Sequence, residues 1–238
     1  MSKTYFISDL HFGHRNILKY EPSRIDATLD YIKNVLHKEC EYTKEDVLKD
    51  FETETKSLVY YILDHHDEML IYKWNKKVKN SDTVWFLGDL GLGNKDNIKN
   101  CTLRLNGIKR IVRGNHDTLP EDFYKDCGFV QVVPRGQELI IKHFFVLSHE
   151  PSAWMNPNSS PYFYLYGHVH SMPQYITKTE NSRCVCVERQ NFEPIEIEEF
   201  NMYQAEESEL DPHKDIKNSI TEKAYIDFLV KETIKGEN

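Results

Sequence analysis

The sequence lacks any run of about 20 apolar residues, the length that a helix needs to cross a bilayer, so we expect no membrane-spanning segment. It also lacks internal repeats and low-complexity tracts, which argues against a repeat array or a disordered chain. No apolar leader precedes the first expected strand, which begins at Thr4. A cytoplasmic protein is therefore expected.

Cysteine is scarce and its spacing is uninformative. The cysteines are Cys40, Cys101, Cys127, Cys184 and Cys186, an odd number without zinc-finger spacing. The close pair Cys184 and Cys186 would share one face of a strand. It could be a redox or metal site, but two small buried hydrophobic residues are the interpretation we favour.

Basic residues are outnumbered, with 30 Lys and Arg against 38 Asp and Glu, for a formal charge of -8. Tight nucleic-acid binding requires a basic surface, so we do not expect it. A small phosphate-ester substrate, including a nucleotide, is compatible with this negative charge, because bound metal ions would supply positive charge at the site. The length of 238 residues and hydrophobic content of 39% fit one α/β domain, 1–238. The sequence does not indicate an oligomeric state.

What the sequence does contain is a series of short polar motifs, each closely following a short run of β-branched, aromatic or aliphatic residues. In order, the motifs are Asp9-Leu10-His11, Gly88-Asp89, Gly114-Asn115-His116-Asp117, His149 and Gly167-His168-Val169-His170. The preceding runs, 4–7, 83–87, 108–112, 144–147 and 163–166, are typical of buried strands. Ligands gather at the carboxyl ends of strands in open α/β sheets, so we expect the motifs to converge.

Carboxylates and imidazoles suit a pair of divalent ions, with one carboxylate bridging them at about 4 Å separation. We predict Asp89 as the bridge. The other predicted ligands are Asp9, His11 and His170 for one ion, and Asn115, His149 and His168 for the other. The Asn115 carbonyl would coordinate without adding negative charge. His168 and His170 can serve different ions only if the backbone turns, which Gly167 makes easier.

In content and order these motifs resemble the signature blocks of the calcineurin-like metallophosphoesterase superfamily, from about residue 4 to residue 200. The resemblance implies an α/β fold of two mixed β-sheets packed as a sandwich flanked by helices. It also implies the ligand roles above and places His116 beside the metals, near the substrate phosphate. One departure is Leu92, because many members have an acidic residue three positions after the bridging aspartate. The missing partner could alter ligand orientation or metal preference.

The resemblance implies a metal-dependent phosphoesterase, and phosphodiesters are the substrates that we expect. The nucleophile would be a hydroxide activated by two metal ions. The alternatives are a phosphomonoesterase, a nucleotide pyrophosphatase and, without catalysis, an interaction scaffold of the same fold. Manganese is the first expectation for both ions, and Fe, Zn, Co and Ni suit the same ligands. His116 would stabilise the phosphoryl oxygens or act as general acid.

Four residues near the motifs have two interpretations each. His14 and Arg15 could contact a substrate phosphate oxygen, or else start a helix and support the ligands. Asp117 could orient the His116 imidazole or cap the following turn. Arg113 could face the metals or point into the fold.

A helical insertion is expected over about 21–80, because apolar residues recur there three and four apart. Its middle helix, around 44–63, would start at Thr43, with Asp46 three residues on. It could be a lid, a dimer contact or a solvated hairpin. The tail, about 211–238, has a helical apolar stripe that would pack on the core or a second subunit. Trp154 and Tyr162 could line a pocket or simply pack.

Overall fold

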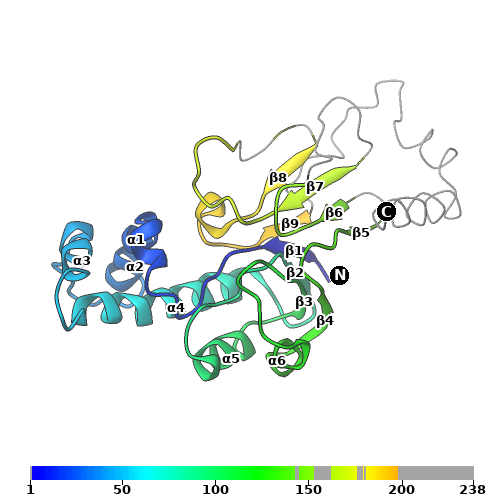
Figure 1. Ribbon diagram of the computed structural model, residues 1–238. Helices are drawn as coiled ribbons and strands as arrows, with labels where there is room; N and C mark the ends of the chain where they lie inside the picture. The colour runs from blue at the N-terminus through cyan, green and yellow to red at the C-terminus, as the bar shows by residue number, and fades with distance from the viewer. Residues whose placement is uncertain (1, 143–144, 153–161, 176–178, 180, 198–238) are drawn as a thin grey trace, which may run out of the picture. The chain divides into compact units, whose positions relative to one another are not determined.

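The computed structural model describes residues 2–142, 145–152, 162–175, 179 and 181–197. Its strands form two sheets, which belong to one compact unit, residues 1–199 (Figure 1). The five-stranded sheet has the order β4-β3-β2-β1-β9, and its strands are β1 Thr4–Ile7, β2 Thr83–Phe86, β3 Ile108–Val112, β4 Phe129–Val133 and β9 Ile195–Glu196. The four-stranded sheet, in order β5-β6-β7-β8, comprises β5 Leu139–Ile141, β6 Phe145–Leu147, β7 Phe163–Tyr166 and β8 Ser182–Cys184.

Both sheets are mixed. Strands β1 to β4 run parallel and β9 runs antiparallel to β1. In the second sheet β5 is antiparallel to β6, while β6, β7 and β8 are parallel. The rings of Phe6 on β1 and Phe145 on β6 have centroids 6.1 Å apart, so the sheets pack on each other. The predicted fold class, two mixed sheets with helices, is confirmed.

The predicted strands agree with β1, β3 and β7 residue by residue, and β2 ends one residue early. The run 144–147 corresponds to β6, although Phe144 lies outside the described residues. The prediction did not include β4, β5, β8 or β9, since none of the chosen polar motifs follows them. These strands lie next to predicted ones in their sheets, where pairing partners satisfy their backbone groups.

The outer face of the five-stranded sheet is covered by α4 Ser57–Lys77, α5 Lys95–Leu103 and α6 Glu121–Asp126 (Figure 1). Alternate residues of β1 and β2, including Ile7 and Phe86, pack there against Trp74 of α4 and Ile98 of α5. Burial on both faces makes the strands rigid supports for the loops at their carboxyl ends.

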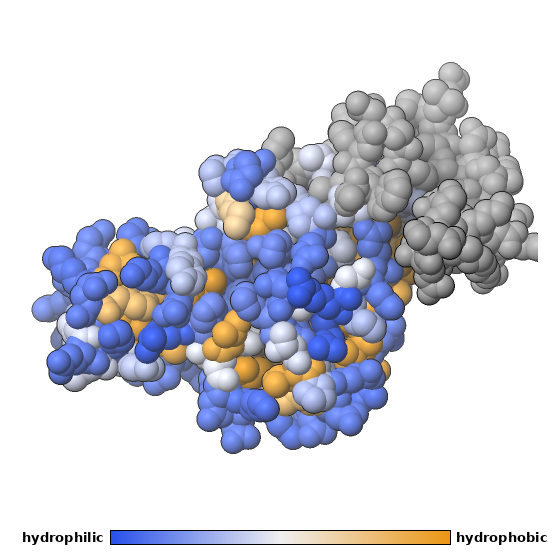
Figure 2. Space-filling view, in the orientation of Figure 1, coloured by the Kyte–Doolittle hydropathy of each residue, from blue (hydrophilic) through white to orange (hydrophobic). Residues whose placement is uncertain are grey.

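The expected insertion, about 21–80, contains α2 Ser23–Asn34, α3 Lys44–Asp50 and α4, and the short helix α1 Ile17–Tyr20 directly precedes it. The insertion has a second apolar cluster, formed by residues such as Ile25, Ile32, Val47 and Ile62. Hydrophobic residues remain visible at the surface over α1 to α3 (Figure 2). No helix among the described residues is both long and apolar enough to span a membrane.

The predicted middle helix, 44–63, is wrong in its extent, although Thr43 does begin it with a capping box to Asp46. It ends at Asp50, whose carboxylate accepts a hydrogen bond from the backbone N–H of Val59 at 2.9 Å, and α4 starts at Ser57. Lys56 between them is left-handed, with φ 50°. This turn breaks the periodic pattern, and the second half of the predicted helix continues to Lys77. The predicted tail, 211–238, lies outside the described residues.

Candidate metal centre

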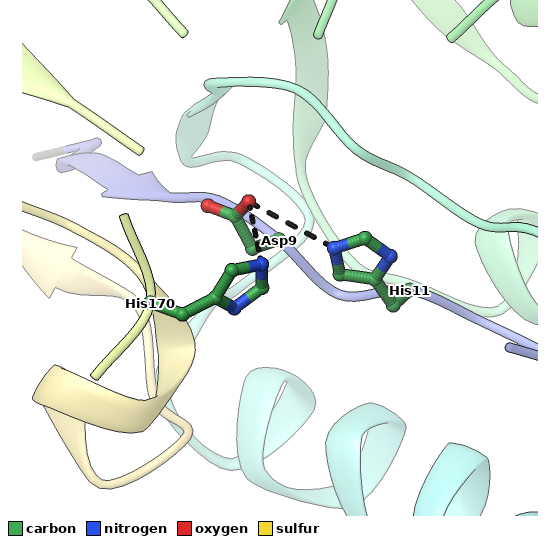
Figure 3. A group of neighbouring side chains, drawn as sticks. All are labelled: Asp9, His11 and His170. Carbon is green, nitrogen blue, oxygen red and sulfur yellow. Dashed lines mark ion pairs between the residues drawn. The ribbon is translucent and has the colours of Figure 1, made fainter. Parts of the chain in front are cut away.

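The loops after β1 and β7 bring Asp9, His11 and His170 together as a first candidate metal group (Figure 3). The Oδ1 atom of Asp9 lies 3.9 Å from Nε2 of His11 and 3.6 Å from Nε2 of His170. Asp9 is fully buried and His11 is almost so. The three side chains predicted to hold one ion therefore face one small volume.

A second candidate group joins Asp89, after β2, to His149, after β6, and His168, after β7. Asn115, after β3, completes it, because its Oδ1 atom lies 2.9 Å from both Nε2 of His149 and Nδ1 of His168. The other nitrogen of His149, Nδ1, lies 2.7 Å from the carbonyl oxygen of Leu87 and donates its hydrogen there. Both ring nitrogens thus face oxygen acceptors, and although burial opposes it, Asp89 raises the pKa of His149 to about 9. A bound ion would replace the proton on Nε2, while Nδ1 keeps its hydrogen bond to Leu87.

Asp89 stands between the two groups. Its Oδ2 atom lies 3.6 Å from Nε2 of His11 in the first group and 3.5 Å from Nε2 of His149 in the second. Its other oxygen, Oδ1, accepts a 2.9 Å hydrogen bond from the backbone N–H of His116. That bond turns the carboxylate so that one oxygen faces both groups, which is the arrangement of a bridging ligand.

The buried polar atoms fit metal ions. Oδ1 of Asp9 and Nε2 of His11 are buried without a hydrogen-bond partner in the described structure. Burying unpaired polar atoms costs free energy, so native proteins satisfy nearly all of them. A divalent ion would satisfy both atoms at once.

The backbone is strained where the ligands lie. Five of the candidate ligands have left-handed φ angles, namely Asp9 61°, His11 54°, Asp89 60°, His168 70° and His170 44°. Such angles are uncommon for residues with a Cβ and persist only where surrounding contacts enforce them. Each angle bends the chain sharply at the end of a strand, which points side chains from different strands inward.

This geometry corrects the role predicted for Gly167. The turn lies at His168 and His170 themselves. A Cβ atom at Gly167 would instead lie 2.5 Å from Oγ of Ser8 and 2.6 Å from Oδ2 of Asp9. Glycine is needed there because the loop passes close to the first group.

Asp117 connects the loops and caps a turn. Its buried carboxylate accepts hydrogen bonds from the backbone N–H groups of Asp89 at 2.7 Å, Leu90 at 3.1 Å and Gly114 at 2.8 Å. Among its described contacts there is none with the His116 imidazole, so of the two interpretations the structure favours the cap. Burial raises the pKa of Asp117.

Arg113 points into the fold. Its guanidinium donates to the backbone oxygens of Asp117 and Leu119 and lies 5.2 Å from the ring centroid of Tyr124.

Arg24 and Glu188, which were not predicted, support the first group. Arg24 on α2 is fully buried and donates to the backbone oxygens of Asp9 at 2.6 Å and Leu10 at 2.9 Å. Its Nε donates at 2.7 Å to Oε1 of Glu188, on the short 3-10 helix Val187–Gln190. The same oxygen lies 3.0 Å from Nδ1 of His170. Burial alone would raise the pKa of Glu188, but Arg24 and His170 lower it to about 2.

A signal for Glu188 was present in the sequence. The apolar run 184–187 is followed directly by a carboxylate, and the runs before Asp9 and Asp89 are followed by one after a single residue. Arg24 offered no such signal, because one arginine in a charged helix resembles a solvated residue.

Helix α4 also supports the loop after β1. The carboxylate of Asp67 accepts a 3.0 Å hydrogen bond from the backbone N–H of Gly13 and another from Nδ2 of Asn97. The neighbouring His66 is fully buried, with Nε2 3.1 Å from Arg24 and Nδ1 3.2 Å from Asp67. The helical insertion thus contributes directly to the framework of the metal centre.

His116 lies beside both groups without joining either. Its side chain is 42% exposed, and its Nε2 lies 4.0 Å from Oδ2 of Asp89. Its role next to a substrate phosphate stays a prediction.

His14 and Arg15 have different surroundings in the structure. Nδ1 of His14 lies 3.2 Å from Nδ1 of His11, and burial lowers the pKa of His14 to about 4. His14 is therefore a neutral neighbour of the first group at pH 7. Arg15 donates to the hydroxyl of Tyr60 on α4 at 2.9 Å. That contact favours a supporting role, while contact of either residue with phosphate stays a prediction.

Cys184 and Cys186 are both buried and free, with sulfurs 3.3 Å apart. The Cys186 thiol donates to Oδ2 of Asp9 at 3.2 Å, and neither cysteine belongs to the metal groups. The buried-hydrophobe interpretation therefore holds, with Cys186 packed behind a candidate ligand. Tyr162 is half-buried next to β7, and Trp154 lies outside the described residues.

Comparisons with known proteins agree with the fold and name no activity. No family model matches the chain. It is 28% identical over 204 residues to an uncharacterized protein of Methanocaldococcus jannaschii, covering 83% of this chain and 89% of that one. It is also 28% identical over 120 residues to the Gene 66 protein of Mycobacterium phage L5, covering 49% and 41%.

Among solved structures, a protein of unknown function from Aquifex aeolicus matches with a TM-score of 0.50 and 21% identity, over 84% of this chain and 98% of that chain. This likeness concerns the fold alone. The fold and the side-chain geometry together define an α/β protein with two candidate His/Asp metal sites.

Proposed function

We propose that this protein is a metal-dependent phosphoesterase that hydrolyses phosphodiesters. The observation that carries the proposal is the position of Asp89, whose Oδ2 atom faces His11 in one group and His149 in the other at 3.6 and 3.5 Å. A single carboxylate shared by two His/Asp groups is suited to two ions close enough to hold one phosphoryl group.

The side chains of this protein would each contribute a different part of the reaction. Two divalent ions bound in these groups would supply positive charge for the phosphate and lower the pKa of a nucleophilic water. Asn115 adds an uncharged oxygen, which limits the negative charge that a phosphate anion would meet. His116, exposed beside Asp89, can donate a hydrogen bond to a phosphoryl oxygen or a proton to the leaving oxygen.

The same residues would also serve a phosphomonoesterase or a nucleotide pyrophosphatase, which are the enzymatic alternatives. An interaction scaffold of this fold is the non-enzymatic one. The unpaired buried atoms of Asp9 and His11, together with five strained ligand backbones, argue against a scaffold. Strained backbone of this kind clusters at active sites and ligand clamps, where surrounding contacts hold it in place.

The test compares metal-free protein with protein given Mn²⁺, using bis(4-nitrophenyl) phosphate as the diester and 4-nitrophenyl phosphate as the monoester. We expect Mn²⁺-dependent hydrolysis that favours the diester. Parallel samples with Fe²⁺, Zn²⁺, Co²⁺ and Ni²⁺ establish the preferred ion.

The matched variants are Asp89→Asn and Asp122→Asn, since Asp122 is a 94% exposed carboxylate on α6. Activity should be lost in the first and retained in the second. A protein that binds two ions per chain yet hydrolyses no ester with any of these metals would support the scaffold and overturn the proposal.

A further inference from the structure

A cavity of about 650 Å³ adjoins the candidate metal centre. Its lining includes His11, His116 and His170, so it opens directly onto the first group and the proposed proton donor. That volume lies within the range of about 300–1,000 Å³ typical of small-molecule sites. A group esterified to a phosphate held at the metals could therefore extend into it.

The remaining walls are largely apolar or aromatic. Tyr20 at the end of α1 is 67% exposed, Leu92 is 42% exposed and Met172 is 43% exposed, and all three line the cavity. Exposed apolar side chains that gather around a polar site are typical of ligand-binding surfaces. Leu92 also occupies the position where the resemblance led us to expect an acidic residue.

The cavity is poorly suited to a second anionic group. Among the described residues, no lysine or arginine lines it. Its acidic residue, Glu21, is held by the backbone N–H and the hydroxyl of Ser171, at 3.3 and 2.6 Å. Lys95 lines a neighbouring cavity of about 220 Å³, which shares Leu92 and His116 with this one but does not include Tyr20. A pyrophosphate would thus meet no countercharge beside Tyr20.

We propose that this cavity binds the nucleoside of a nucleoside phosphodiester, with the base stacked on Tyr20 and flanked by Leu92 and Met172. The proposal rests on the proposed function and specifies its substrate. A nucleoside is uncharged and planar at its base, so it suits walls that are largely apolar and carry no lysine or arginine among the described residues. Asn16, which also lines the cavity, adds hydrogen-bonding groups for its polar atoms.

The experiment uses Mn²⁺-loaded protein and two diesters with the same leaving group, thymidine 5′-(4-nitrophenyl phosphate) and methyl 4-nitrophenyl phosphate. Stacking of one base on an aromatic ring predicts that Tyr20→Ala lowers kcat/KM for the nucleoside ester by about 5- to 150-fold. The methyl ester should be little affected, and Tyr20→Phe should retain the nucleoside preference. Tyr72→Ala, at a 38% exposed tyrosine on α4, is the matched control.

A second measurement separates this proposal from the proposed function. Binding of thymidine 5′-monophosphate and of inorganic phosphate is measured by calorimetry on the same loaded protein. Tighter binding of the nucleotide that disappears in Tyr20→Ala, without any hydrolysis, would support the cavity and overturn the esterase activity. Equal affinities for the two ligands, or faster cleavage of thymidine 5′-diphosphate than of the nucleoside diester, would overturn the cavity proposal.

Discussion

Replacing Glu188 by glutamine should weaken metal binding at the first group, although Glu188 is not itself a candidate ligand. The substitution keeps the size of the side chain and removes its charge. Oε1 of Glu188 is shared by Nε of Arg24, at 2.7 Å, and Nδ1 of His170, at 3.0 Å. The change therefore leaves the Arg24 guanidinium buried without its counter-charge, and it weakens the acceptor that orients His170.

The substitution should lower both the stability of the protein and its affinity for metal. Removing one partner of a buried ion pair costs about 3–5 kcal/mol, and Arg24 is fully buried. For a domain of this size each kcal/mol lowers Tm by about 2–4 °C, so Tm of the metal-free protein should fall by roughly 6–20 °C. Loss of the partner that orients a histidine ligand typically weakens metal binding about 10- to 100-fold.

The assay has two parts. Thermal unfolding of the metal-free protein is followed by circular dichroism. Mn²⁺ binding is then titrated calorimetrically at a temperature where every variant is folded. Glu68→Gln is the control, because Glu68 forms an exposed ion pair with Arg104 at 2.6 Å. Such pairs contribute about 0–1 kcal/mol.

Glu188→Gln should affect one ion more than the other. Glu188→Gln should weaken the site of Asp9 and His170, while His168→Ala should weaken the other site. If Glu188→Gln has the same Tm and the same affinity for both ions as Glu68→Gln, the supporting role of Glu188 is refuted. If it weakens both sites equally, Glu188 does not act through His170.

Three further predictions concern the centre itself. Chelation should abolish activity and Mn²⁺ should restore it, and elemental analysis should find about two metals per chain in the wild type and far fewer in Asp89→Ala, since Asp89 faces both groups. Full occupancy in that variant would contradict the bridging assignment. His116→Ala should keep its metals and lose roughly 10²- to 10⁴-fold in kcat, with a larger loss for an alkyl than for a nitrophenyl ester, as expected of a general acid. An equal loss for both esters would mean that His116 only stabilises the phosphoryl oxygens, and lost metal would identify it as a ligand. Gly114→Ala should also lose metal, because its Cβ would lie 2.3 Å from Oδ1 of Asp89 and must displace that carboxylate. Wild-type metal content there would show that the loop can move aside.

The helical insertion shows where sequence patterns stop being informative. Its periodicity correctly indicated helices and the capping box at Thr43. It did not reveal that Asp50 would cap the start of α4 or that α4 would run on to Lys77. A lid, a dimer contact and a solvated hairpin were all compatible with the pattern. The structure places Arg24 and Asp67 of the insertion against the loop that carries Asp9 and His11, and His66 lies between these two supporting residues.

Local patterns in the sequence were enough to predict the strands that precede the motifs and the candidate ligands, because a buried strand and a metal-binding side chain both leave local signals. An apolar run and the polar residue that follows it are adjacent in the chain. The folded chain was needed to show that one oxygen of Asp89 faces both groups, and that Arg24 donates to the carbonyl oxygens of Asp9 and Leu10. It alone showed that Cys186 packs behind Asp9. These contacts join residues far apart in sequence, and their geometry depends on sheet register, strained turns and the packing of helices that no local pattern encodes.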